Sequence, residues 1–245
     1  MHWWFPGNAS SVGGKVDALF YVILYITGAV FLLTEATLIV FLVRYRHREG
    51  RKAAHIEGST KAEIIWTAIP AVILIAIAVV SLPLWAKIKQ DKDYPPNADR
   101  LGIEAKQYQW NVTYPGPDGK LGTDDDFQKV DSLHLVVNRD YVMDLTARDV
   151  VHSFFVPAFR IKQDLVPGMD IKAWVRPTKT GVFEIACAEL CGLGHYRMRG
   201  LVFVETPRQH AVWLVSQGAA SAADSALAAS PAADSAAPSQ GKGAP

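Results

Sequence analysis

Two long apolar runs near the N-terminus constrain the fold of this chain more than any other feature of its sequence. Residues 19–43 contain a single charged side chain, Glu35, and residues 64–84 contain none. An α-helix needs about 20 apolar residues to cross a hydrocarbon core about 30 Å thick, so both runs are predicted to span a membrane. A signal sequence is the alternative for the first run, but this run is longer than the apolar segment of a signal sequence.

The charges around the two runs predict their orientation. The segment between them, residues 44–61, is rich in basic side chains and contains few acidic ones: Arg44, Arg46, Arg48, Arg51, Lys52 and Lys61 against Glu49 and Glu57. Basic loops stay on the cytoplasmic side, so both termini are expected on the extracytoplasmic side. A carboxyl group inside a span is costly unless it faces protein, and Glu35 is therefore expected to pack against a helix of a larger integral partner.

The rest of the chain has the composition of a soluble domain. Residues 88–100 are polar and include Pro95 and Pro96, which is typical of a linker. Short alternating runs separated by turn residues then predict a β-sandwich or barrel. The expected strands are residues 102–107, 109–114, 133–137, 141–147, 153–156, 171–175, 181–186 and 200–205. Residues 207–215 are expected to form a closing helix with Thr206 as its N-cap.

The predicted organisation is an α+β membrane protein, in which an N-terminal two-helix transmembrane hairpin precedes an all-β sandwich. Residues 1–17 form an extracytoplasmic segment, residues 18–87 the hairpin and residues 101–215 the sandwich. Residues 216–245 are rich in alanine, serine and proline, with Leu227 as the one large apolar side chain, so this tail is predicted to be disordered. The formal net charge of +1 gives no general attraction to nucleic acid.

The strongest chemical signal is a short segment that contains the only two cysteines of the chain. Cys187 and Cys191 are followed closely by His195 and Met198. A disulfide is the alternative outside the cytoplasm, but it gives no reason for a histidine and a methionine at these intervals. Thiolate, imidazole and thioether together suit copper. Zinc has no use for a methionine or for electron transfer, so a copper site is predicted.

A second imidazole must come from elsewhere in the chain. His152 follows the expected strand 141–147 after a short turn, and a sandwich commonly brings such a loop beside a later one. His134 is the alternative, but its place within an alternating strand is typical of an ordinary half-exposed histidine. His152 is therefore the predicted ligand.

This constellation resembles the one in subunit II of cytochrome c oxidases, whose dinuclear copper centre, CuA, uses the pattern Cys-x-Glu-x-Cys-x-x-x-His-x-x-Met. The resemblance covers both apolar runs and the whole β-rich region, but not the tail. It extends to Asp-Val-Val-His-Ser at 149–153, Asp-Leu-Val-Pro-Gly at 164–168, Gln109-Trp110, and Glu-Ile-Ile-Trp-Thr at 63–67. It implies that the sandwich is cupredoxin-like.

The resemblance also implies a role for each matching residue. The thiolates of Cys187 and Cys191 would bridge the two coppers. His152 and His195 would each bind one copper. Met198 would be a weak thioether ligand of one copper, and Glu189 would offer its backbone carbonyl to the other. The Glu189 carboxylate would bind a magnesium or manganese ion shared with the catalytic subunit.

The implied function is to accept electrons from cytochrome c at CuA and pass them to the haem-copper catalytic subunit I, which reduces O2 to water with proton pumping. Trp110 would admit the electrons, and Glu63 would stand at the entrance of a proton path. The chain lacks a Cys-x-x-Cys-His motif for its own haem. The implied partners are subunit I, other oxidase subunits, cytochrome c or a similar donor, and the lipid of a bacterial-type plasma membrane or an equivalent respiratory membrane.

Two features depart from the family pattern. Residues 115–126 form an acidic, glycine-rich insertion, for which docking of a lysine-rich cytochrome c is the favoured interpretation and calcium binding the alternative. Asn111 and Val112 replace a common aromatic pair, and Arg148 is basic where the family's docking face is acidic. The identity of the donor therefore stays open. The alternative functions are a membrane-anchored copper-binding or copper-delivery protein without an electron-transfer role, and a quinol oxidase subunit, which should lack the copper ligands.

Overall fold

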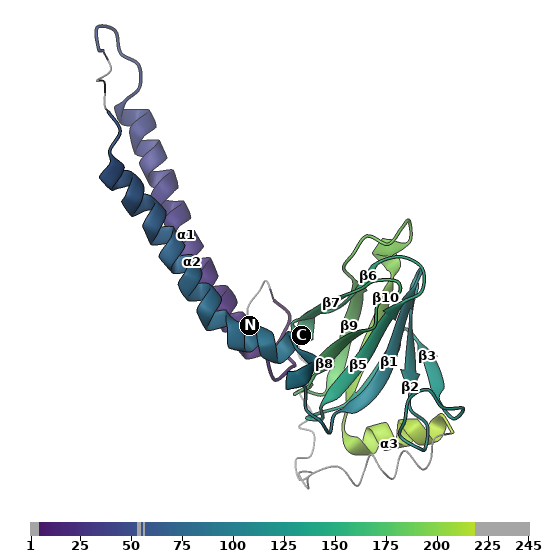
Figure 1. The fold of residues 1–245 in the computed structure, drawn as a ribbon. Coiled ribbons are helices and arrows are strands. Elements are labelled where there is room, and N and C mark those ends of the chain that lie inside the picture. The colour runs from purple at the N-terminus through teal and green to yellow at the C-terminus, as the bar shows by residue number, and fades with distance from the viewer. Residues whose placement is uncertain (1–4, 53–54, 56, 219–245) are drawn as a thin grey trace, which may run out of the picture. The chain divides into compact units, whose positions relative to one another are not determined.

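The computed structural model describes residues 5–52, 55 and 57–218, which form two compact units (Figure 1). One unit is Val12–Tyr94, and the other combines the N-terminal residues up to Ser11 with the chain from Pro95 onward. The N-terminal segment joins the second unit through backbone hydrogen bonds, among them Ala9 N to Ala158 O at 2.9 Å and Thr178 N to Ala9 O at 2.8 Å. The predicted N-terminal segment 1–17 is therefore divided between the two units.

The first unit confirms the two predicted apolar helices, α1 (Gly13–Arg44) and α2 (Thr60–Lys89). Both are long and apolar enough to cross a membrane, with mean hydropathy 2.2 and 2.6 over their most apolar stretches. Ser59 caps α2, since its side chain accepts a hydrogen bond from Ala62 N at 3.4 Å. Threonine hydroxyls within α1 bond back to the preceding turn, for example Thr34 Oγ1 to Val30 O at 2.8 Å, which hides their polarity from lipid.

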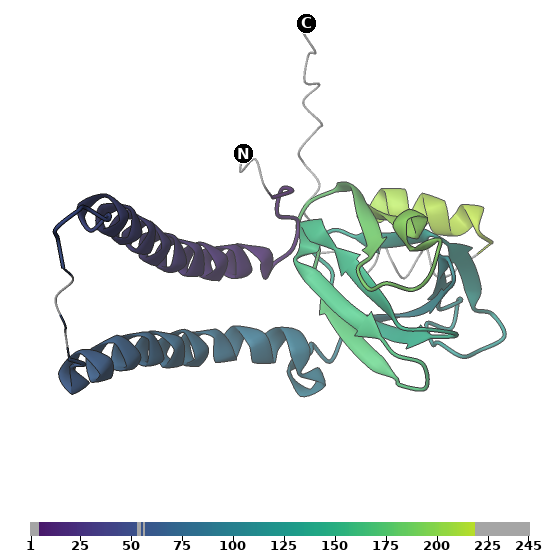
Figure 2. The same cartoon turned by 90° about the horizontal axis from the view of Figure 1, so that it is seen from above.

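The second unit is a β-sandwich of two five-stranded sheets whose inner faces enclose the core (Figure 2). The first sheet has the order β3-β2-β1-β5-β8 and the second β4-β10-β9-β6-β7. The strands of the first sheet are β1 Asp99–Lys106, β2 Gln109–Tyr114, β3 Phe127–Val130, β5 Tyr141–Ala147 and β8 Ile171–Val175. Those of the second sheet are β4 Ser132–Val136, β6 His152–Val156, β7 Ile161–Leu165, β9 Gly181–Cys187 and β10 Arg199–Glu205.

All eight predicted strands are confirmed, and two strands were missed. The missed strands, β3 and β7, each pair with one neighbour only, so they are edge strands. An edge strand buries little of its surface, and β7 accordingly reads as apolar only at its two ends, Ile161 and Leu165. The predicted linker 88–100 is shorter than expected, because α2 runs to Lys89 and β1 already begins at Asp99.

The predicted closing helix is confirmed as α3 (Pro207–Ser216), with Thr206 and Gln209 forming a reciprocal capping box. It covers one end of the sandwich, where the Trp213 ring lies 5.0 Å from that of Tyr114. The predicted disordered tail, residues 216–245, falls outside the described residues from 219 onward.

The strand register separates the loops into two ends. The β1–β2 turn at Gln107, the β5–β6 loop after Ala147 and the β9–β10 loop after Cys187 lie at one end, here called the cysteine end. Tyr114 closes β2 at the opposite end, beside α3, and the acidic insertion 115–126 follows it there. The insertion therefore lies at the opposite end from the cysteines, and its role in docking a cytochrome c stays a prediction.

Candidate metal centre

The structure gathers the predicted copper ligands at the cysteine end. The Sγ atoms of Cys187 and Cys191 lie 3.8 Å apart. Cys187 Sγ is 3.9 Å from His152 Nδ1 and 3.2 Å from the carbonyl oxygen of Glu189. On the other side, Cys191 Sγ is 3.6 Å from His195 Nδ1 and 3.8 Å from Met198 Sδ, so the two sulfur atoms lie between the imidazoles.

These separations fit metal coordination and not a disulfide. A disulfide bond is about 2.05 Å long, and both cysteines are free. Two donors bound to one metal at about 2.0–2.3 Å with tetrahedral angles lie roughly 3.3–3.8 Å apart, close to the spacings found here. The donors comprise soft sulfur and imidazole nitrogen, a set that favours copper. The donor set therefore suits a copper centre with both thiolates at its middle.

Four of the donor side chains are shielded from water, and that of His195 is half-buried. His152 is 0% exposed, and the side chains of Cys187, Cys191 and Met198 are buried as well. Burial, followed by the proximity of Cys187, raises the pKa of the Cys191 thiol to about 12. Metal binding must therefore displace the proton of the Cys191 thiol, and the free energy of that deprotonation reduces the net affinity, as is usual for a buried thiolate site.

The local backbone explains how one short loop presents several ligands. Cys187 ends β9, and its N–H donates to Met198 O at 3.1 Å, which closes the loop at its base. Gly192 has φ +131°, a conformation that favours glycine. A Cβ atom at Gly192 would lie 2.6 Å from the Tyr108 hydroxyl oxygen, and one at Gly194 would lie 2.5 Å from Tyr108 Cδ2. The two glycines thus let an aromatic ring rest against the ligand loop.

Asp149 fixes the orientation of His152. Its Oδ1 lies 2.8 Å from His152 Nε2 and 2.7 Å from Val150 N, and its Oδ2 lies 2.7 Å from Gln107 N. An ionised carboxylate only accepts hydrogen bonds, so His152 donates from Nε2 and directs the Nδ1 lone pair toward Cys187. Burial works to raise the pKa of the Asp149 carboxyl, but these hydrogen bonds outweigh it and hold the pKa below its usual value.

Three residues around the centre were missed by the sequence reasoning. Asp149 was noted only as part of a matching segment, Tyr108 was not noted, and Gln107 was assigned only to a strand. Gln107 Nε2 donates to Cys191 O at 2.6 Å and so ties the β1–β2 turn to the ligand loop. The signal for Asp149 was its spacing from His152, which a tight loop turns into a direct contact. No signal in the sequence pointed to Tyr108 and Gln107, because their contacts with the ligand loop arise only from the pairing of strands into sheets.

Two other predicted site residues lie elsewhere. Trp110 is 0% exposed, and its ring centroid is 6.4 Å from that of His152 and 5.6 Å from that of Phe154. A fully buried ring cannot contact a docked protein, so Trp110 lies behind the ligand and not at the surface. Glu63 is exposed in the first turn of α2, far along the chain from the cysteines and in the other unit.

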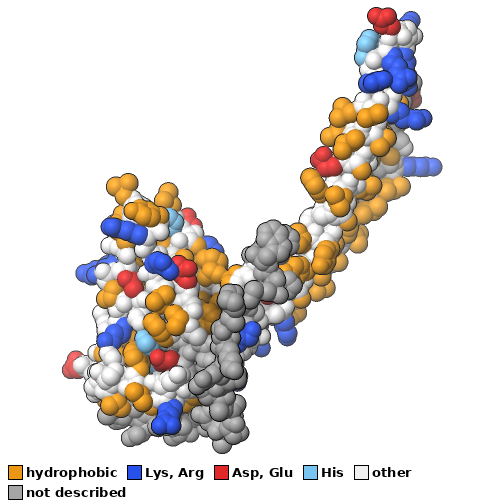
Figure 3. Space-filling model, turned by 180° about the vertical axis from the view of Figure 1, so that it is seen from behind, with side chains coloured by type: hydrophobic (Ala, Val, Ile, Leu, Met, Phe, Trp, Pro, Cys, Tyr) orange, Lys and Arg blue, Asp and Glu red, His pale blue; other side chains and the backbone are white. Residues whose placement is uncertain are grey.

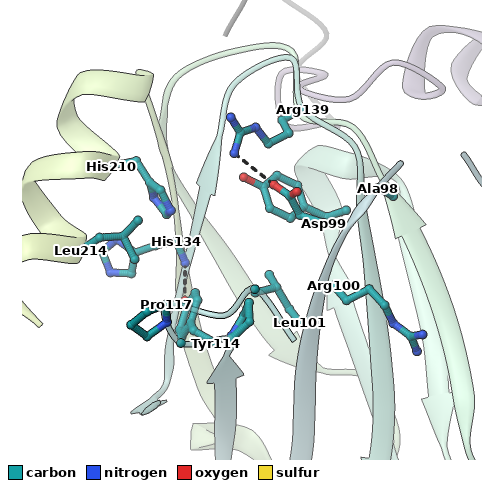
Figure 4. A pocket seen from close by; sticks show the side chains of 14 residues that line it. Ala98, Asp99, Arg100, Leu101, Tyr114, Pro117, His134, Arg139, His210 and Leu214 are labelled. Atoms are coloured by element: carbon teal, nitrogen blue, oxygen red, sulfur yellow. Dashed lines mark hydrogen bonds and ion pairs between the residues drawn. The ribbon is translucent and has the colours of Figure 1, made fainter. Parts of the chain in front are cut away.

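His134, the alternative ligand, lies at the α3 end in the wall of a cavity of about 460 Å³ (Figure 4). Its Nδ1 is 3.1 Å from Glu205, its Nε2 is 2.9 Å from Ser132 Oγ, and its ring stacks on Trp213 at 4.0 Å. Glu205 also pairs with His210 at 2.9 Å. Burial works to raise the pKa of Glu205, but the two histidines lower it to about 2. This cluster secures α3 and is separate from the copper ligands.

Comparisons with known proteins agree with this geometry. The family model described as "Cytochrome C oxidase subunit II, transmembrane domain" matches residues 1–84, and the one described as "Cytochrome C oxidase subunit II, periplasmic domain" matches residues 123–205. The chain is 33% identical over 237 residues to the alternative cytochrome c oxidase subunit 2 of Bradyrhizobium diazoefficiens, covering 88% of this chain and 84% of that protein. It is 31% identical over 267 residues to cytochrome c oxidase subunit 2 of Thermostichus vulcanus, covering 86% of this chain and 78% of that protein.

Among solved structures, the periplasmic domain of subunit II of cytochrome oxidase from Bradyrhizobium japonicum matches with 31% sequence identity and a TM-score of 0.44. That match covers 49% of this chain and 94% of the other. The sequence matches extend over both the helical and the β unit, as the predicted fold class requires. The chain belongs to the cytochrome c oxidase subunit II family.

Proposed function

We propose that this chain accepts electrons from a cytochrome c-type donor at a dinuclear copper centre and passes them to the haem-copper catalytic subunit of the oxidase. Membership of the family makes the chain a membrane-anchored subunit of cytochrome c oxidase, a haem-copper terminal oxidase. The observation that carries the finer proposal is the pair of free thiols 3.8 Å apart with an imidazole beside each of them. Reduction of O2 and proton pumping belong to the catalytic subunit.

The protein's contribution to electron transfer is a rigid, dry set of ligands. When bound, the copper pair would take up and release one electron at a time. Cys187 and Cys191 would hold the copper, and Asp149 holds His152 in one orientation, so little of the protein would need to move when the charge changes. Glu189 contributes its carbonyl oxygen beside Cys187 Sγ, while its exposed side chain is free to meet a magnesium or manganese ion at the catalytic subunit.

Copper loading of the purified full-length chain tests the centre. We expect two coppers per chain and an EPR spectrum of an electron shared between them, and Cys187→Ser or Cys191→Ser should abolish that spectrum. Binding of a single zinc ion without a shared-electron copper signal would refute the proposal. Copper that a mild chelator removes within seconds would instead favour the copper-delivery alternative.

Electron transfer to the centre is proposed to involve Trp110 as an inner contact. Its ring packs on the ligand His152, so replacement by alanine would open a core cavity costing about 3–5 kcal/mol. Trp110→Phe keeps most of the packing and is the better probe. We expect it to slow reduction of the copper by cytochrome c while leaving the copper spectrum unchanged; unchanged kinetics would reduce Trp110 to a core residue.

Glu63 is proposed to stand at the entrance of the proton path into the catalytic subunit, on the side of the membrane set by the basic loop before it. Its structural alternative is a first-turn carboxylate that favours the helix dipole by about 0.3–1 kcal/mol. In the assembled oxidase, Glu63→Gln should lower turnover while reduction of the copper centre stays fast. Glu57→Gln, which changes an exposed carboxylate in the loop before α2, is the matched control. Equal turnover in both variants and wild type would remove the proton role.

The same basic loop supports the proposed placement of the chain. A cytoplasmic loop puts both termini and the copper domain on the extracytoplasmic side of the plasma membrane. There the domain would meet its electron donor. A protease added to intact spheroplasts should then cleave the β unit and spare residues 44–61, and the reverse pattern would overturn the placement.

A further inference from the structure

A groove between α1 and α2 lies in the half of the helical hairpin away from the basic loop 44–61. Its volume is about 840 Å³, within the range of about 300–1,000 Å³ typical of ligand sites. It extends from Lys15 to Ile26 on α1 and from Ile73 to Lys87 on α2. A rise of about 1.5 Å per residue makes it about 17 Å long on α1 and about 21 Å long on α2. Half of a hydrocarbon core about 30 Å thick measures about 15 Å, so the groove spans about one leaflet.

The walls of the groove are apolar. The lining side chains recur at helical spacing, so one face of each helix forms a wall. They include Leu19, Val22 and Ile26 on α1 and Ile73, Ile77 and Val80 on α2. Among the described lining residues, Ser81 is the one polar uncharged side chain, and its hydroxyl donates to Ala78 O at 3.0 Å. A hydrocarbon chain in the groove would therefore leave no polar side chain of these walls without a hydrogen bond.

Positive charge is confined to one end of the groove. Lys15 and Lys87 are the only charged residues among the described ones that line it, and both are exposed. Lys15 lies in the first turn of α1 and Lys87 in the last turn of α2, at the level where lipid headgroups meet the hydrocarbon. Figure 3 shows a separate group of basic side chains at the far end of the hairpin, on the loop that joins the helices. The two lysines therefore give the open end of the groove a charge that attracts a lipid phosphate.

The groove lies on a different face of α1 from the one expected to meet the catalytic subunit. Glu35 is expected to pack against a partner helix, because a carboxyl group that faces lipid is costly. It lies about two and a half turns beyond Ile26, which places the two residues on opposite sides of α1. A partner helix on the Glu35 side leaves the groove side to lipid.

We propose that the groove holds one anionic phospholipid, with its phosphate between Lys15 and Lys87 and an acyl chain along the apolar walls toward the middle of the bilayer. A zwitterionic lipid would fill the walls equally well, but its headgroup carries no net charge. A lysine near an anionic headgroup contributes about fivefold in affinity, so two lysines should favour phosphatidylglycerol over phosphatidylcholine by about 25-fold. This site does not depend on the copper centre or on the proposed electron transfer.

The test uses the assembled oxidase in phosphatidylcholine bilayers, with spin-labelled phosphatidylglycerol as the probe and spin-labelled phosphatidylcholine as its reference. EPR of the label separates lipid held by the protein from mobile lipid. The double variant Lys15→Gln with Lys87→Gln should lose about one held phosphatidylglycerol per chain and keep no more than about a twofold preference for it at this site. The matched control is Lys89→Gln with Lys92→Gln, which removes two exposed charges at the same end but outside the groove.

A second pair of variants tests the apolar walls without a change in charge. Ala76 lines the groove and Ala78 does not, so Ala76→Phe should expel the lipid and Ala78→Phe should retain it. The copper spectrum should stay normal in every variant, which checks that the β unit is folded.

Four results would overturn the proposal. The first is an equal amount of held phosphatidylglycerol in wild type and in the Lys15 and Lys87 double variant. The second is an equal loss in the Lys89 and Lys92 control, which would indicate attraction to the whole headgroup surface. The third is displacement of the lipid by excess inorganic phosphate, which would indicate a site for a free anion. The fourth is failure of Ala76→Phe to assemble with the haem-containing subunit, which would make the groove a subunit contact.

Discussion

Replacing Asp149 with asparagine separates the role of ligand orientation from that of the ligands themselves. The Asp149 carboxylate accepts hydrogen bonds on both oxygens, from Gln107 N on Oδ2 and from His152 Nε2 and Val150 N on Oδ1. Asparagine has one accepting oxygen, so its amide must face a donor on one of the two sides. Either His152 loses its orienting partner or the β1–β2 turn loses its tie to the loop.

The expected magnitude follows from the contact that is lost. Residues that orient a metal ligand typically contribute 10–100-fold in metal affinity, about 1.4–2.7 kcal/mol. We therefore expect Asp149→Asn to raise the apparent copper dissociation constant about 10–100-fold while both thiolates remain in place. Competition with a chelator, followed by the copper–thiolate absorption, measures this constant.

A matched variant separates orientation from loss of charge. Asp164 lies on β7, where its Oδ1 accepts from Ser153 Oγ and Lys162 Nζ, each at 2.6 Å, and this carboxylate contacts no copper ligand in those bonds. Asp164→Asn should change copper affinity by less than about threefold, because a surface charge of this kind is screened. Equal affinities for Asp149→Asn and wild type, with the apo domain folded by circular dichroism, would refute the orienting role.

Three further predictions concern packing and pH. Gly194→Ala should lower the free energy of unfolding by about 1–3 kcal/mol, since its Cβ would meet Tyr108 Cδ2 at 2.5 Å. Gly7→Ala should leave the free energy of unfolding unchanged, because the space around Gly7 is open. In a Tyr108→Ala background, Gly194→Ala should no longer lower the free energy of unfolding, because the ring it meets is absent. The pKa of Glu205 falls from 4.5 to about 2 on folding, so its contribution to stability is present above pH 4.5 and is lost as pH falls toward 2. In Glu205→Gln, the free energy of unfolding should fall by about 1–2 kcal/mol less over that pH range than in wild type. An unchanged acid transition would count against the His134–Glu205–His210 cluster. Copper binding should release thiol protons, because the pKa of Cys191 is raised to about 12, so apparent copper affinity should fall at least about tenfold per unit decrease in pH near neutrality; pH-stat titration with no proton release would contradict this.

Local sequence signals were sufficient for the elements that depend on local forces. The apolar runs alone predicted α1 and α2, because crossing a bilayer requires only length and hydrophobicity. The cap formed by Thr206 could be predicted for a similar reason, because the capping residues lie within one helical turn of each other. The edge strands β3 and β7 were missed because an edge strand needs few apolar side chains, and its pairing comes from a neighbour distant in sequence.

The copper site shows the same division. By itself, the sequence singled out the proposed ligands that share one loop, from Cys187 to Met198, because their spacing already brings sulfur and imidazole together. Only the tertiary structure decided between His152 and His134, put Trp110 in the core and Tyr108 against the ligand loop, and moved the acidic insertion to the far end. Each of those outcomes depends on strand order and register. The sequence of a strand does not show which other loops lie at the same end of the sandwich, because that is set only when the strands pair.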